Sequence, residues 1–253
     1  MTEAFLSRRM GQFSYFSKQV GARRWRGKHV LDFGGNIGNI LCDRNSTIDE
    51  ERYWCLDVVN AAIEKGRNLH PKSHWVFYNR YCFSFNPQGI PGLPIPDLGQ
   101  KFDLILAFSV FTNTKPTEMF ELVPQLESKL ADHGALAFTF IDPNHWSSGK
   151  YNGNNFQCRL ETEKQRGHLA NGEKDDLLRR VQFADWFMLV NGRRLYVETE
   201  EIDRYDPDEE KTCYVFHTKE YMKSKFPHAA ILPPVNNEMQ HCCVIRKSQR
   251  SEL

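Results

Sequence analysis

The stretch HVLDFGGNIGNILCD, residues 29–43, places strand-forming residues directly before a cluster of glycines. Gly34, Gly35 and Gly38 fall within five consecutive positions. Glycine loses more backbone entropy on folding than any other residue, so such a cluster indicates a tight turn or a close approach to another group. A glycine-rich turn that leads from a strand into a helix points its amide groups at a ligand. A turn with a purely structural role is the alternative.

Short apolar runs alternate with amphipathic segments on either side of this turn. Strands of this length that alternate with helices predict a mostly parallel sheet covered on both faces. We expect helices over NAAIEKGRNLH, after the second strand, and over TEMFELVPQLESKL, before the fifth. The expected strands are 29–33, 52–57, 74–78, 103–108 and 135–141, followed by two closing strands in AAILPPV and EMQHCCVIRK.

The regular alternation stops after residue 143 and resumes near residue 214. Residues 144–213 are rich in charged side chains and contain two β-rich runs separated by Asn191-Gly192, a strong hairpin signal. We therefore expect a core formed by 29–143 and 214–253, interrupted by a helix-plus-hairpin insertion at 144–213. Because the insertion leaves the core at the end of the fifth strand, it is expected to act as a substrate lid. Residues 1–28 are expected to form a helical segment that covers the site.

Composition narrows the classes of function. The 253 residues hold 33 Lys and Arg against 32 Asp and Glu, a formal charge of +1, which disfavours binding to a long phosphate backbone. No apolar run reaches the length of a membrane span, and the first residues lack the apolar core of a signal peptide. The 7 cysteines are scattered without a CxxC pair, which indicates reduced thiols rather than a zinc site or disulfides. The sequence predicts a cytoplasmic protein without a metal.

An acidic residue stands at the end of the second expected strand. Asp57 lies 25 residues after Asp32, and a carboxylate at this place can accept hydrogen bonds from both hydroxyls of a ribose. A glycine-rich turn followed by such an acid indicates a cofactor that contains adenosine.

The acid before the turn separates two kinds of adenosine cofactor. Asp32 precedes Gly34 by two positions and gives the pattern DxGxxxG, whereas dinucleotide sites follow GxGxxG. The pattern resembles the first motif of class I S-adenosylmethionine-dependent methyltransferases, with Asn36 in place of the central glycine. Asparagine tolerates positive φ better than most non-glycine residues. The resemblance covers about 25–143 and the last two strands, and extends to WCLDVV (54–59), FDLILAFSVFTNT (102–114) and LADHGALAFTFIDP (130–143).

The resemblance is to the bacterial members of the family that act on small molecules. It implies a doubly wound, Rossmann-like fold with a seven-stranded sheet, S-adenosylmethionine as cofactor and a small-molecule acceptor. It places Asp57 on the ribose hydroxyls, Val58 on adenine and Asn79 near the adenine amino group. Phe108 and Ser109 would border the sulfonium. The methionine and ribose portion would contact the turn, namely Asp32, Gly34, Gly35, Asn36 and Gly38. For Asp32, a structural carboxylate that binds loop amides is an equal alternative.

Three residues are candidates for catalysis. Methyl transfer from a sulfonium is an in-line displacement, and a hydroxyl acceptor also needs a base, usually histidine. His145 follows the fifth strand at the end where open α/β sheets bind ligands, and His241 begins the last strand. Asp142 shares the position of His145 and could orient the acceptor, or it could cap the turn before Pro143.

The preferred function is therefore methyl transfer to a small molecule, with oxygen favoured over nitrogen as the acceptor atom. A methyltransferase acting on RNA or protein is a second reading, opposed by the balanced charge. A nicotinamide-dependent oxidoreductase is a third, opposed by the absence of GxGxxG. A non-catalytic protein that binds the cofactor or a partner is a fourth, because the sequence shows no unmistakable base.

Overall fold

A computed structural model describes residues 11–21, 24–147, 153–170, 172–199, 212–235 and 239–247, and its centre is a seven-stranded sheet. The strand order is β11-β12-β5-β4-β1-β2-β3. β1 to β5 run parallel, whereas β12 is antiparallel to β5 and β11 is antiparallel to β12. The expected doubly wound, mostly parallel sheet is confirmed. The strands are β1 (Val30–Phe33), β2 (Tyr53–Asp57), β3 (His74–Phe77), β4 (Phe102–Ala107), β5 (Leu130–Phe140), β11 (Ala230–Leu232) and β12 (His241–Arg246).

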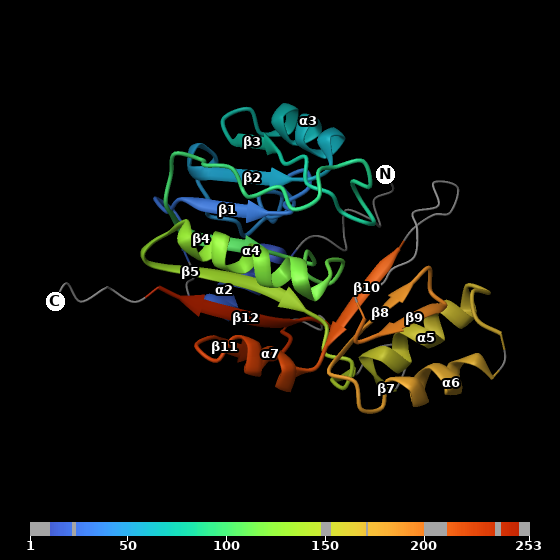
Figure 1. Ribbon diagram of the computed structural model, residues 1–253. Coiled ribbons are helices and arrows are strands. Elements are labelled where there is room, and N and C mark those ends of the chain that lie inside the picture. Colours follow the sequence, from blue (N-terminus) through green and yellow to red (C-terminus); the bar gives the residue numbers. More distant parts are fainter. Residues whose placement is uncertain are drawn as a thin grey trace.

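Helices cover both faces of this sheet (Figure 1). α4 (Pro116–Ser128) and α7 (Lys219–Lys225) pack on one face, where Met119, Leu122, Val123 and Leu126 form the buried stripe of α4. This spacing of three and four residues keeps apolar side chains on one side of a helix. α2 (Gln12–Val20) and α3 (Asn60–Leu69) pack on the opposite face.

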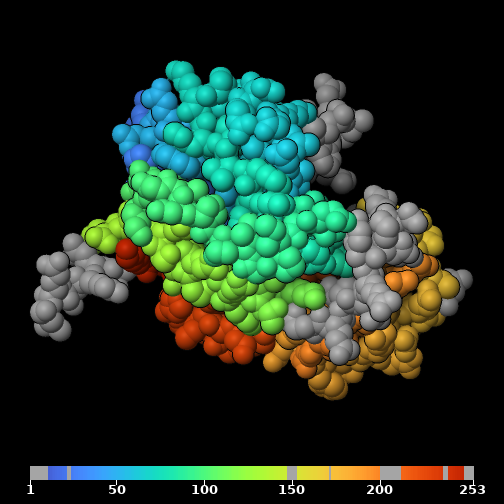
Figure 2. All heavy atoms as spheres, turned by 45° about the horizontal axis from the view of Figure 1, so that its top comes forward, coloured from blue at the N-terminus to red at the C-terminus, as the bar shows by residue number. Residues whose placement is uncertain are grey.

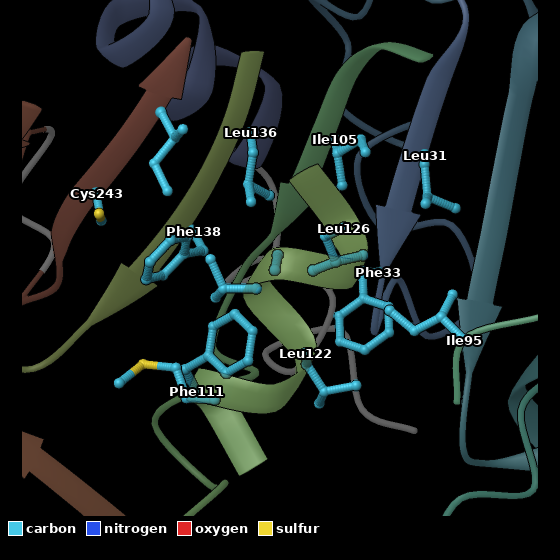
Figure 3. Close-up of a cluster of buried hydrophobic side chains, with 14 of the residues drawn as sticks. Leu31, Phe33, Ile95, Ile105, Phe111, Leu122, Leu126, Leu136, Phe138 and Cys243 are labelled. Carbon is cyan, nitrogen blue, oxygen red and sulfur yellow. The ribbon is translucent and has the colours of Figure 1, made fainter. Parts of the chain in front are cut away.

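Alternate residues of the strands point to opposite faces of the sheet and pack in two hydrophobic cores, one on each face. Leu31 and Phe33 of β1 face α4, whereas Val30 faces α2 and α3. Figure 3 shows the first of these cores, a cluster that includes Leu122, Leu126 and Phe138. Burying each such side chain contributes about 1.5–3 kcal/mol. This packing fixes the positions at which the parallel strands end.

A second unit follows β5 and lies on the side of the core to which the arrowheads of β1 and β2 point (Figure 1). Its antiparallel sheet has the order β10-β8-β9, and one face packs on α5 and α6. In Figure 2 this unit, in gold and orange, forms one end of the molecule. The elements are β6 (Trp146–Ser147), β7 (Gly153–Asn154), α5 (Asn155–Gln165), α6 (Glu173–Arg180), β8 (Trp186–Val190), β9 (Arg194–Val197) and β10 (Cys213–His217).

The structure moves the expected boundary of the insertion. Residues from 214 onward were expected in the core, but β10 pairs with β8 along its whole length, so the second unit continues to His217. The apolar run of β10 is buried between β8 and the core, where Val215 N donates to Thr112 O over 2.8 Å. The hairpin itself forms as expected, with Asn191 and Gly192 at positive φ of 51° and 71°.

Two further differences concern local structure. The glycine cluster does not lead into an α-helix but into a series of turns, because Gly38 at a φ of 81° interrupts a right-handed continuation. β5 begins at Leu130, five residues before the expected start, because Phe102 pairs with Leu130 across a register shift. The first ten residues of the expected helical segment 1–28 lie outside the described residues.

None of the helices in the described part of the chain combines the length and the apolar character that a membrane span requires.

Candidate functional site

A cavity of about 340 Å³ opens at the carboxyl ends of β1, β2 and β4. In an open α/β sheet this is where the strand order reverses and where ligands bind. The chain runs outward from β1 to β3 and then returns to β4 on the other side, so the reversal lies between β1 and β4. The wall consists of residues that directly follow these strands, including Gly34, Val58 and Phe108.

The glycine turn is held against the end of β2 by backbone hydrogen bonds. Gly34 has a φ of 76°, and its N donates to Leu56 O over 2.7 Å. Asn36, which stands where the motif has a glycine, also has a positive φ, 56°. Asparagine thus adopts the backbone conformation that glycine would adopt there. The backbone N of Asn36 donates to Asp57 Oδ2 over 2.7 Å. The turn is thus fixed by the acid that the sequence predicts as a ligand contact.

Both side-chain oxygens of Asp57 accept hydrogen bonds from backbone amides. Oδ2 accepts from Asn36 N, and Oδ1 accepts from Val59 N over 2.8 Å. The side chain lines the cavity although the residue is only 6% exposed. A carboxylate only accepts hydrogen bonds, so a ligand that meets Asp57 in the cavity must supply donors.

Asp32 lies beneath the turn and does not line the cavity. The Tyr53 hydroxyl donates to its Oδ2 over 2.7 Å, and a Cβ placed on Gly35 would come within 2.5 Å of the same oxygen. Burial raises the pKa of Asp32 to about 7; the Tyr53 hydrogen bond opposes this shift, and the charge of Asp57 adds to it. The donor that the structure gives Asp32 is therefore a phenol of β2 rather than a loop amide.

The far end of the cavity is polar and was not anticipated. Arg80 is 3% exposed and forms a bidentate ion pair with Glu121, at 3.1 and 2.7 Å, while Glu118 Oε1 lies 3.9 Å from its Nη2. Arg80 and Glu118 both line the cavity. Burial raises the pKa of Glu118, and the nearby Arg80 charge opposes that shift. Asn79 instead points its Oδ1 at Asn86 Nδ2, 3.2 Å away, and does not line the cavity.

Ser109 forms the wall at the end of β4 and has a positive φ of 58°. Its backbone N donates to Thr139 Oγ1 over 2.8 Å, and Gln240 bridges the two by donating to Ser109 Oγ and accepting from Thr139 Oγ1. Phe108 beside it makes edge contacts with Tyr15 and Phe16 of α2, at centroid distances of 5.4 and 5.9 Å. The N-terminal helix therefore supports this wall.

The three candidate catalytic residues gather one strand further along the sheet. The rings of His145 and His241 meet edge to face at 4.9 Å, and His241 stacks on Phe140. Burial lowers the pKa of His241 to about 4, with the charges of His145 and Lys219 adding to the shift. Asp142 Oδ1 accepts from Asn144 N over 3.0 Å, which matches the turn-capping alternative.

The predicted site residues thus divide into two groups, and their roles remain predictions. The cavity wall contains Gly34, Asn36, Asp57, Val58, Phe108 and Ser109. The residues placed elsewhere are Asp32, Gly35, Gly38, Asn79, Asp142, His145 and His241. Sequence reasoning missed the wall contributed by Tyr78, Arg80, Tyr81, Cys82, Phe85, Val110, Asn113 and Glu118. The run YNRYCF, with an arginine among aromatic residues directly after β3, was the available signal.

Within the described ranges, no group of three or more His, Cys, Asp or Glu side chains could hold a metal ion.

We predict that Asp32→Asn changes the pH dependence of stability. A carboxyl whose pKa is raised on folding, here from 3.8 to about 7, destabilises the fold as pH rises through that window, because the unfolded chain ionises first. Above pH 7 the free energy of unfolding is lower by about 4 kcal/mol, at 1.36 kcal/mol per pKa unit. Asparagine removes this loss, so its Tm relative to wild type should increase between pH 4 and pH 8.

The control is Asp132→Asn, because the side chain of Asp132 is 76% exposed. Burying the second polar atom of an amide costs about 1–3 kcal/mol at every pH. The test is therefore the slope of the Tm difference against pH in the protein without ligand. Parallel curves for Asp32→Asn and wild type would contradict a raised pKa of Asp32.

Comparisons of the sequence with known proteins give no match. No protein-family model matches the chain, and no curated protein matches it.

Among solved structures, an S-adenosylmethionine-dependent methyltransferase from Clostridium acetobutylicum superimposes with a TM-score of 0.51 at 12% identity, covering 95% of this chain and 92% of that one. CalS10, an amino pentose methyltransferase from Micromonospora echinaspora, gives 0.49 at 13% identity over 95% and 92% of the two chains. The glycopeptide N-methyltransferase MtfA gives 0.49 at 10% identity over 93% and 89%. At such identities a likeness concerns the backbone, and the first of the three carries it: the chain has the Rossmann-like fold of an S-adenosylmethionine-dependent methyltransferase.

Proposed function

We propose that the protein transfers the methyl group of S-adenosylmethionine to a small-molecule acceptor. The observation that carries the proposal is the cavity between the glycine turn and Asp57, at the point of the sheet where the strand order reverses. Its volume of about 340 Å³ falls within the range of small-molecule sites, about 300–1,000 Å³. When bound, the cofactor supplies an electrophilic methyl group on a sulfonium.

Asp57 is the residue proposed to hold the ribose. Its carboxylate lines the cavity beside the glycine turn, and a carboxylate is an acceptor that suits the hydroxyl donors of a ribose. The turn from Gly34 to Asn36 would lie against the ribose and methionine, while Val58 and Val110 offer apolar contacts to the adenine ring. Ser109 would border the sulfonium together with Phe108, whose ring is fixed by α2.

Glu118 is better placed than Asn79 to bind the adenine amino group. Asn79 is occupied by Asn86, whereas Glu118 lines the cavity and has Arg80 as a distant ion-pair partner at 3.9 Å. A carboxylate accepts hydrogen bonds only, which matches an amino donor. We therefore transfer the predicted role of Asn79 to Glu118.

The acceptor is proposed to approach between Ser109 and the pair formed by His145 and His241. Gln240, the residue before His241, contacts Ser109 directly, so the cavity wall and the histidine pair are neighbours across β4, β5 and β12. His145 is half-buried and follows β5, so it is the better candidate for taking a proton from a hydroxyl. His241, with a pKa near 4, is neutral at physiological pH and would orient His145.

Cofactor identity and the role of Asp57 are tested together by calorimetry. The protein should bind S-adenosylmethionine, and Asp57→Ala should weaken this binding by about 1.5–3 kcal/mol, the range for a hydrogen bond to a charged group. Asp57→Asn keeps one acceptor oxygen but turns its NH2 group toward the second backbone amide, so it should also weaken binding. Binding of NAD without any binding of S-adenosylmethionine would overturn the proposal; unchanged affinity in Asp57→Ala would remove only this residue from the site.

His145→Ala should lower kcat for a hydroxyl acceptor by at least about a hundredfold, because loss of a general base costs about 10²–10⁴-fold. The affinity for S-adenosylmethionine should not change, since His145 lies outside the cavity wall. His228→Ala, at a histidine whose side chain is 56% exposed, is the matched control. A loss of only a few-fold with an unmoved pH–rate profile would remove His145 from the mechanism, and the same test on His241 would then decide whether any histidine acts or positioning alone carries the transfer.

The second unit is proposed to act as a lid over the acceptor. One face of its sheet packs on Phe83, in the loop that lines the cavity with Tyr81 and Cys82, and β10 is bonded to Thr112. The residues that would select the acceptor therefore lie on the sheet of the second unit and on the cavity loop that packs against it.

Gly192→Val should perturb this lid without touching the cofactor cavity. Gly192 has a φ of 71°, which strains any L side chain, and an added Cβ would come within 2.4 Å of Glu163 Oε2, so the hairpin tip or the Glu163 carboxylate must move. We expect a raised acceptor KM and an unchanged affinity for S-adenosylmethionine. Gly99→Val, at a φ of 64° with open space around it, controls for backbone strain alone. An equal effect on both ligands would contradict the lid.

A further inference from the structure

Three side chains outside the cavity form a relay of a thiol, an imidazole and a carboxylate. Cys42 Sγ lies 3.8 Å from His70 Nε2, and His70 Nδ1 lies 3.0 Å from Glu50 Oε1. If Nδ1 carries the proton and donates it to Glu50, Nε2 is left as an acceptor directed at the thiol. A base oriented by a third group is the arrangement that activates a cysteine nucleophile.

The relay is assembled from segments that the core holds in place. Cys42 ends the turns that follow the glycine cluster, and its backbone N donates to Gly38 O over 3.3 Å. His70 follows α3, and its carbonyl accepts from Trp75 Nε1 over 3.1 Å. Glu50 belongs to the short helix η1 (Glu50–Arg52) before β2. The backbone hydrogen bonds and Trp75 therefore hold the three segments that bring these side chains together.

Cys42 differs from the other cysteines in its access to solvent. It is the exposed one of the 7, whereas Cys82 is half-buried and the remaining 5 are buried. Partial burial raises the pKa of the Cys42 thiol, so without help it would be a poor nucleophile at neutral pH. A base in contact with the sulfur removes this obstacle.

We propose that Cys42 is a modification site that forms mixed disulfides with small-molecule disulfides, with His70 as its base and Glu50 as a positioning residue. His70 takes the thiol proton, and the Cys42 sulfur attacks one sulfur of the disulfide. The new S–S bond forms as the old one breaks, and the departing thiolate receives the proton from His70. One disulfide is exchanged for another, so no further oxidant is needed.

The rate of reaction with dithiodipyridine at neutral pH tests the proposal on the full chain. Release of thiopyridone gives the rate, and mass spectrometry of peptides identifies the labelled cysteine. Wild type should react fastest at Cys42, and Cys42→Ser should lose that phase. His70→Gln should slow it at least about tenfold, since a positioned base contributes about 10²–10⁴-fold. Glu50→Gln should give an intermediate rate, which Glu50→Asp should partly restore.

Glu51→Gln is the matched control, because Glu51 neighbours Glu50 but its carboxylate pairs with Lys72 at 3.7 Å. Its rate should equal that of wild type. Thermal unfolding of each variant shows whether His70→Gln still folds; if it does not, the Glu50 variants decide the question. The proposal is wrong if His70→Gln, or Glu50→Gln where His70→Gln does not fold, reacts at Cys42 within about twofold of wild type, or if Cys82 takes the label first.

Discussion

The hydrogen bond from Asn36 N to Asp57 Oδ2, 2.7 Å long, ties the turn after β1 to the end of β2. Together with the bond from Gly34 N to Leu56 O, it fixes the spacing between the two loops that form the cavity. Both Gly34 and Asn36 adopt positive φ to make these contacts. A residue that resists positive φ at either place would separate the turn from β2 and remove the cavity wall with it.

The same contact brings two carboxyl groups close together under one turn. Asp57 accepts from two backbone amides, while Asp32 has a phenol as donor and a pKa raised to about 7. Burial is the main cause of this shift, and the charge of Asp57 adds to it. The two acids therefore differ in their surroundings: Asp57 lines the cavity, whereas Asp32 lies buried beneath the turn and holds its proton to a higher pH than an exposed aspartate does.

One strand of the second unit, β10, forms backbone contacts with the core. β10 contacts the core at Ile141, which bridges to Phe216, and at Thr112, which accepts from Val215 N. Both contacts lie just beyond the ends of β5 and β4, next to the residues that follow these strands at the site. Any shift of the three-stranded sheet must therefore reach the loop that carries Ser109 and Asn113. This linkage gives the insertion a mechanical connection to the cavity in addition to its place beside it.

The sequence by itself determined the core of this protein. Alternation of strands and helices predicted the sheet, and the glycine turn with Asp57 predicted the place of the cavity, because both signals are local. Only the tertiary structure decided which side chains enter the wall. Asn79 and Arg80 are adjacent in the sequence, yet hydrogen bonds to Asn86 and Glu121 turn the first away and hold the second at the cavity. The contact between Gln240 and Ser109 spans 131 residues, and the packing that creates such a contact leaves no periodicity in the sequence.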